Sequence, residues 1–111
     1  MPNNEPKNFN ALLIDSVDET ISGVLGSKIN SELWTHYQAF LGITRDEMPY
    51  RVSTLFEFLN GTLGIAGETL GKVIVKKLYA KANIPLHYDP NRPLADYVEE
   101  LRRIFDNKHM Q

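Results

Sequence analysis

The sequence predicts an all-α domain, a compact bundle of four to five helices that ends in an amphipathic helix after a proline-containing connector. Apolar residues recur at three- and four-residue spacing in successive windows, which is the period of one helix face. A glycine or an asparagine follows most of these windows, as helix ends often require. The strand-like run Val73 to Val75 lies within a longer window of helical period.

A length of 111 residues suits one domain, and 42% hydrophobic with 23% charged residues argues against wholesale disorder. Within it we expect five segments. They are a flexible lead-in (1–9), a helical domain (10–83), a connector (84–93), a C-terminal amphipathic helix (94–106) and a tail (107–111).

The first helix is expected from Ala11 to Leu25, with Asn10 as its N-cap. Its apolar stripe comprises Phe9, Leu12, Leu13, Val17, Ile21, Val24 and Leu25. Asp15, Asp18 and Glu19 lie off this stripe and are expected to face water.

Ser27 or Asn30 is expected to cap the second helix, which should reach Leu41. Gly26 and Gly42 can adopt the left-handed conformation that ends a helix. Its apolar face comprises Ile29, Leu33, Trp34, Tyr37, Phe40 and Leu41. Two helices joined around one glycine predict an antiparallel hairpin.

A short turn and a third helix should follow. Thr44 and Glu47 have the spacing of a capping box, and Pro49 limits the helix there to about one turn. The third helix is expected from Thr54 to Leu63, with Ser53 as N-cap. Leu55, Phe56, Leu59 and Leu63 should face inward.

The fourth helix is expected from Ala66 to Ala82, with Asn83 just after its end. Its stripe comprises Ala66, Leu70, Val73, Ile74 and Leu78, with Tyr79 beside it. Gly67 and Gly71 lie one turn apart and would let another helix approach closely.

Those two glycines continue a series begun by Gly61 and Gly64. In the packing interpretation, Gly61 or Gly64 ends the third helix. The alternative is a loop that cradles a phosphate before a helix N-terminus. The spacing matches neither the dinucleotide-binding fingerprint nor the P-loop, which favours packing.

The segment from Leu86 to Pro90, followed by an amphipathic helix, is the feature that most suggests function. The stripe of that last helix comprises Leu94, Val98, Leu101 and Phe105. The helix either caps the core of the first four or docks on a second subunit or a partner groove, and the sequence leaves both open.

Four lysines of the fourth helix, Lys72, Lys76, Lys77 and Lys81, are predicted to form one broad basic face. Together with the stripe of the last helix they are the candidate partner surface. The face could instead be solvated, pair with the acidic face of the first helix, or meet nucleic acid. The lack of arginine among these lysines weakens the nucleic-acid interpretation.

Trp34, His36 and Tyr37 form a candidate pocket for a small ligand or an enzymatic reaction. A catalytic histidine needs a nucleophile or a second acid beside it, and no such motif occurs near His36. More often such a histidine lies beside a helix face and meets solvent. We therefore name no catalytic residue.

Composition excludes several classes of protein. Cysteine is absent, so disulfides, thiol catalysis and thiolate metal sites are excluded. The scattered histidines form no metal motif, and we expect no cofactor. The net charge of −2 gives no general attraction to nucleic acid or membrane. With no signal-peptide pattern and no long apolar run, a cytoplasmic location is expected.

Several stretches share a pattern with a known family: residues 10–19, a Gly-Ile-x-x-x-x-Met-Pro stretch from Gly42 to Pro49, and the glycine-spaced helix that closes on residues 76–79. Over residues 10–83 the chain resembles short archaeal signal-transduction output domains of the Nitrosopumilus type. The resemblance implies an all-helical, non-catalytic module in archaeal signalling.

The sequence therefore predicts a non-catalytic helical interaction or regulatory domain whose partner is a protein or a second copy in a homodimer. The first alternative is a nucleic-acid-binding domain that uses the lysines of the fourth helix. The second is a ligand-binding or enzymatic pocket around Trp34, His36 and Tyr37.

Overall fold

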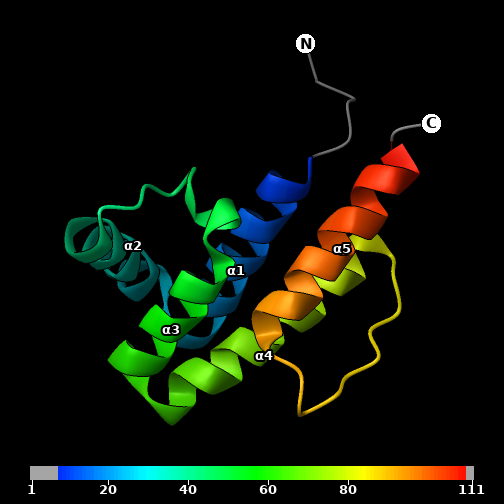
Figure 1. The fold of residues 1–111 in the computed structure, drawn as a ribbon. Coiled ribbons are helices and arrows are strands. Elements are labelled where there is room, and N and C mark those ends of the chain that lie inside the picture. Colours follow the sequence, from blue (N-terminus) through cyan, green and yellow to red (C-terminus); the bar gives the residue numbers. More distant parts are fainter. Residues whose placement is uncertain (1–7, 110–111) are drawn as a thin grey trace.

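The structure, a computed structural model, describes residues 8–109, which form five α-helices and one short 3₁₀ helix with no strand among them (Figure 1). The elements are α1 (Phe9–Leu25), α2 (Ser27–Leu41), η1 (Met48–Tyr50), α3 (Val52–Leu63), α4 (Ile65–Ala82) and α5 (Leu94–His109). The predicted all-α bundle with a C-terminal helix after a connector is confirmed.

The first helix begins earlier than the sequence predicted. Asn8, not Asn10, is the N-cap, and its Oδ1 accepts a hydrogen bond from the backbone N–H of Ala11 at 2.8 Å. Phe9 is buried and meets the ring of Phe105 with centroids 5.8 Å apart. Burial of Phe9 favours the earlier start. Residues 1–7 of the predicted lead-in lie outside the described residues.

Other boundaries also differ from the prediction. Gly26 occupies the N-cap position of α2 in place of Ser27 or Asn30, and α4 starts at Ile65 rather than Ala66. α3 starts at Val52, and Arg51 occupies the N-cap position in place of Ser53. Val52 is buried, and its packing against the core favours a helix that begins at this residue. α5 continues to His109 rather than ending at 106, since the sequence places neither glycine nor proline before that point.

The turns between helices follow their local sequence. Gly26 and Gly42 adopt φ of 97° and 68°, which a Cβ would disfavour. The capping box is formed: Glu47 Oε1 accepts from the Thr44 N–H at 2.8 Å, and Thr44 Oγ1 accepts from the Glu47 N–H at 3.2 Å. The hydrogen bond from the Thr44 backbone holds the pKa of Glu47 below its usual value.

α4 is the central helix, packed against α1, α3 and α5. Its face buries Leu70, Ile74 and Leu78 against the other helices. The predicted close approach occurs at Gly67, where an added Cβ would lie 2.0 Å from the carbonyl oxygen of Leu59 in α3. Gly67 lies inside α4, and it packs against α3 there, as the packing interpretation predicts.

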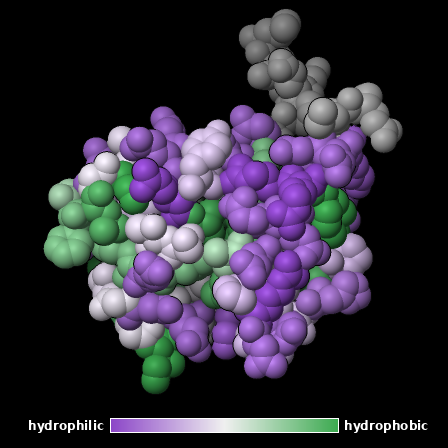
Figure 2. Space-filling view, viewed as in Figure 1, coloured by the Kyte–Doolittle hydropathy of each residue, from purple (hydrophilic) through white to green (hydrophobic). Residues whose placement is uncertain are grey.

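α2 packs chiefly against α1, and its Tyr37 also meets Phe58 of α3 with ring centroids 5.2 Å apart. This arrangement leaves Phe40, predicted to face inward, 75% exposed near the end of α2. Val24, Ile29 and Ala66, also assigned to inward stripes, are exposed as well, and all three lie near a helix end. Figure 2 shows hydrophobic residues gathered on the side of the molecule where α2 lies and hydrophilic ones over α5.

The structure decides the role of the last helix within this chain. Val98 and Leu101 are fully buried, and Leu94 and Phe105 pack at the edge of the same core. α5 therefore caps the core of the other helices, with contacts to α3 and α4.

Candidate functional site

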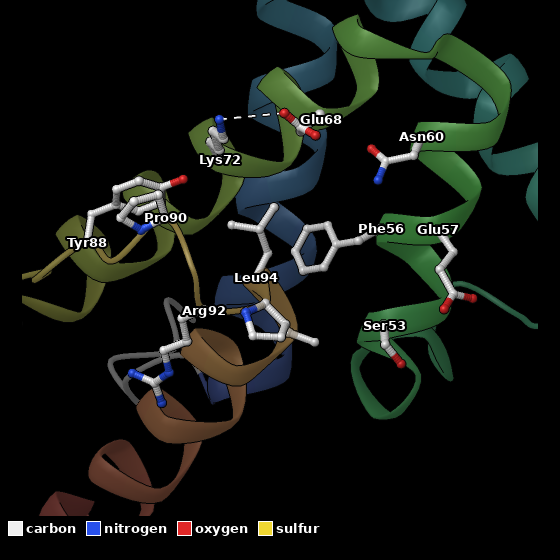
Figure 3. Close-up of a pocket in the computed structure, with 12 residues that line it drawn as sticks. Ser53, Phe56, Glu57, Asn60, Glu68, Lys72, Tyr88, Pro90, Arg92 and Leu94 are labelled. Atoms are coloured by element: carbon white, nitrogen blue, oxygen red, sulfur yellow. Dashed lines mark ion pairs between the residues drawn. The ribbon is translucent and has the colours of Figure 1, made fainter.

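A groove of about 410 Å³ lies between α3, α4 and the segment that leads into α5 (Figure 3). We call it the connector groove. Phe56 of α3 and Leu94 of α5 point toward each other at its floor. Its remaining lining residues are Ser53, Glu57, Asn60, Glu68, Lys72, Tyr88, Pro90, Arg92, Pro93 and Ala95.

The floor depends on the absence of a side chain at Gly71. A Cβ there would lie 2.9 Å from Leu94 Cδ1 and 3.2 Å from Phe56 Cδ1. Gly71 thus leaves room for these two apolar side chains to lie over α4. Glycine spacing in the sequence therefore contributes to the shape of this groove as well as to helix packing.

A smaller hollow of about 270 Å³ continues the groove along α4, and we call it the lysine hollow. It shares Lys72, Tyr88 and Leu94 with the connector groove. Its other lining residues are Val75, Lys76 and Leu86. The lining combines apolar side chains with two lysines and includes no carboxylate.

Tyr97 holds the connector against the helices. Its hydroxyl donates to the carbonyl oxygen of Asp89 at 2.8 Å and accepts from the backbone N–H of the same residue. The ring of Tyr88 stacks on the ring of Tyr97 with centroids 6.0 Å apart and planes 13° apart. Tyr97 is fully buried, whereas Tyr88 is 47% exposed. The stack therefore presents Tyr88 as an ordered aromatic surface.

The charges around the groove are partnered to different degrees. Arg92 pairs with Glu100 and lies over the ring of Tyr97, and the hydrogen bond to Glu100 raises the pKa of Arg92. Lys72 Nζ lies 3.7 Å from Glu68 Oε1 in an exposed ion pair, and such a pair contributes little to the stability of the fold. Lys76 is exposed and makes no ion pair with the residues that the structure describes. Lysine charge is thus available beside an apolar hollow.

The lysines predicted to form one basic face lie on two flanks of α4. Lys72 and Lys76 border the lysine hollow, whereas Lys81 turns toward α1 and pairs with Glu19 at 2.8 Å. Lys77 lies one turn before Lys81, on that same flank. The structure therefore brings together two of the four lysines, and the predicted pairing with the acidic face of the first helix holds for Lys81.

The stripe of the last helix, proposed from sequence as a contact surface, lies mostly inside the protein. Val98 and Leu101 are fully buried, and Phe105 is partly buried against Phe9. Leu94 alone among these residues lines the connector groove and the lysine hollow.

Trp34, His36 and Tyr37 do not share one pocket. Trp34 and Tyr37 line a small internal space of about 10 Å³, whose lining includes Phe58. His36 is exposed on another side of α2 and stacks on Phe40 with centroids 5.7 Å apart. Burial raises the pKa of Tyr37. The predicted pocket is therefore divided between a void in the core and the surface.

Trp34 instead belongs to a polar cluster around Asp18, which sequence reasoning placed toward water. Asp18 Oδ1 accepts from Trp34 Nε1 at 2.7 Å and from Asn30 Nδ2 at 3.0 Å. Arg45 forms an ion pair with Asp18 and lies over the Trp34 ring, 5.0 Å from its centroid. The sequence indication of this cluster is the position of Asp18 next to Val17, a residue of the apolar stripe of α1.

Sequence reasoning also missed the α3 side of the groove, namely Phe56, Glu57 and Asn60. These residues are far along the chain from the connector, and only the packing of α3 beside α4 brings them to it. The connector, which the sequence suggests as a functional feature, lines the groove through Tyr88 and Pro90.

Comparison of the chain with protein-family models, with curated proteins and with solved structures found no match. In the described part of the chain, no cluster of three histidine, aspartate or glutamate side chains could hold a metal ion. Among the helices of residues 8–109, none is long and apolar enough to cross a membrane. The function is therefore inferred from the residues that line the connector groove and the lysine hollow.

Proposed function

We propose that this chain is a non-catalytic helical interaction domain that binds a segment of a partner protein in the connector groove. The observation that carries the proposal is an apolar floor of Phe56 and Leu94 beside an exposed, stacked Tyr88. Apolar and aromatic centres surrounded by polar rims are typical of protein interfaces. A role in archaeal signalling or regulation, which the sequence resemblance implies, is part of this proposal.

Preorganisation supports binding at this groove. The stack on buried Tyr97 and the hydrogen bonds to Asp89 already hold Tyr88 in place. A partner that contacts Tyr88 would lose little conformational entropy in ordering the connector, which leaves more of the contact energy for affinity.

A photoreactive phenylalanine analogue placed at Tyr88 tests the proposal in lysate of the source cells. We expect one discrete adduct, and we expect excess unlabelled protein to suppress it. The matched control places the analogue at Lys28, an exposed position of α2 away from the groove. Adducts of equal yield at both positions, or none at Tyr88, would reject the groove as a binding site.

We further propose self-association as a second candidate, because Phe40 protrudes beside a hollow of about 530 Å³ between α2 and α3. The hollow is lined by His36, Phe40, Leu41, Thr54, Glu57, Phe58, Gly61 and Thr62. In a two-fold dimer each patch meets its own copy, so each Phe40 could enter the hollow of the other subunit.

Light scattering over a wide concentration range tests this homodimer. We expect the mass to double with concentration for the native chain and to remain that of a monomer for Phe40→Ser. Val24→Ser is the matched control, since Val24 is an exposed apolar residue outside the hollow. A native chain that stays monomeric throughout would exclude self-association by this surface.

A further inference from the structure

The charges of the lysine hollow, which continues the connector groove, point to the chemistry of the occupant, and we infer that the partner segment is an acidic amphipathic helix. This inference rests on the proposed function, since it names the class of segment that the groove binds. It is carried by the lysine hollow, in which Lys72 and Lys76 flank Val75, Leu86 and Leu94 with no carboxylate in the lining.

The spacing of the two lysines favours a helix with paired acids. Lys72 and Lys76 lie four residues apart on α4, which corresponds to about 6 Å along the helix axis. Two acidic residues four positions apart on a partner helix have the same separation. A helix lying alongside α4 could therefore place one carboxylate against each ammonium group.

The apolar residues of the hollow define the adjacent stripe of that helix. At about 270 Å³ the hollow is smaller than most ligand pockets, and it suits individual side chains rather than a whole cofactor. Leucine or phenylalanine residues three or four positions apart would contact Leu86, Leu94 and the exposed face of Tyr88. This is the helix-in-groove mode of recognition.

The distribution of charge along the groove also orients the partner. Glu57, on the α3 side, is exposed and makes no ion pair with the residues that the structure describes. An acidic helix would be repelled there and attracted over Lys72 and Lys76. The pairing of Lys72 with Glu68 is exposed and 3.7 Å long, so the ammonium group can turn to a ligand at little cost.

Fluorescence anisotropy with two short synthetic peptides tests the inference on the full chain. The acidic peptide carries glutamates four positions apart beside a leucine stripe, and the basic peptide has lysine at the same positions. We expect the acidic peptide to bind, with affinity that falls as salt rises, and the basic peptide not to bind.

Charge reversal makes the test specific. We expect Lys72→Glu combined with Lys76→Glu to weaken binding of the acidic peptide by at least about tenfold and to allow the basic peptide to bind. The matched control combines Lys28→Glu with Lys77→Glu, which changes the net charge equally at positions outside the hollow. Circular dichroism would verify that both variants fold.

Several outcomes would overturn the inference. They are equal binding of the two peptides, no effect of reversing Lys72 and Lys76, and duplex DNA that competes with the acidic peptide for these lysines. If the adduct at Tyr88 forms but no acidic peptide binds, the acidic helix is wrong and the interaction domain stands. If neither is seen, both proposals fall.

Discussion

Gly67→Ala should destabilise the protein even though alanine is the better helix former. An ideal Cβ at Gly67 would lie 2.0 Å from the Leu59 carbonyl oxygen, 2.5 Å from its carbonyl carbon and 3.0 Å from the Asn60 nitrogen. These are backbone atoms of α3, so no side-chain rotation can relieve the overlap. The two helices would have to move apart along their contact.

The magnitude follows from two opposing contributions. Forcing extra atoms into a packed contact costs about 1–3 kcal/mol, and a collision with backbone belongs at the upper end. The gain in helix propensity offsets at most about 1 kcal/mol. We therefore expect Gly67→Ala to lower the free energy of unfolding by about 2 kcal/mol.

Gly61→Ala provides the matched control, since the same methyl group would meet no atom within 4 Å. It lies inside α3, where we expect alanine to raise the free energy of unfolding by about 0.5–1 kcal/mol. Urea denaturation followed by circular dichroism measures both midpoints. If Gly67→Ala matches the native chain, or if both variants shift in the same direction, the helix contact at Leu59 is wrong.

Three further predictions concern polar contacts. Asp18→Asn should destabilise the fold by about 1–2 kcal/mol and change Trp34 fluorescence, because charge-assisted bonds are lost; unchanged urea midpoints would contradict this. Arg102→Lys should cost about 1 kcal/mol, because lysine cannot both bond to Asn10 and lie flat over Phe9, 4.7 Å from the ring centroid; full stability would refute that geometry. The pKa of Glu47 in the folded chain is lowered from its ordinary value of 4.5, so its stabilisation is present above about pH 4.5 and lost as pH falls through the folded pKa. NMR titration should show this carboxyl titrating below the usual glutamate value, and an ordinary value would count against the capping box.

The candidate site was predictable in part. The sequence indicates the lysines of the fourth helix, Leu94 and the connector, and Lys72, Lys76 and Tyr88 lie together at the lysine hollow. The predicted basic face is too broad, because the four lysines lie on two flanks of α4 rather than on one surface. Residues five positions apart on a helix, such as Lys72 and Lys77, differ by about 140° around the axis.

The α3 contribution could not be predicted from local patterns. Phe56 and Glu57 are ordinary members of an amphipathic helix, and nothing near them in sequence marks a groove. Their role arises because α3 packs beside α4, so that residues of α3 and of the connector line one groove. Asp18 is similar, since its bonds to Trp34 and Arg45 link residues distant in sequence.

The sequence by itself determined the approximate positions of the helices and the glycines that end α1 and α2. Apolar periodicity, the capping box from Thr44 to Glu47 and the glycine before and after α2 are local properties that need no tertiary information. Only the tertiary structure decided that α5 caps its own core, that Phe40 stays exposed and that Phe9 and Val52 join their helices. Those outcomes depend on which apolar face meets which neighbour, and the free energy of that burial comes from residues far apart along the chain.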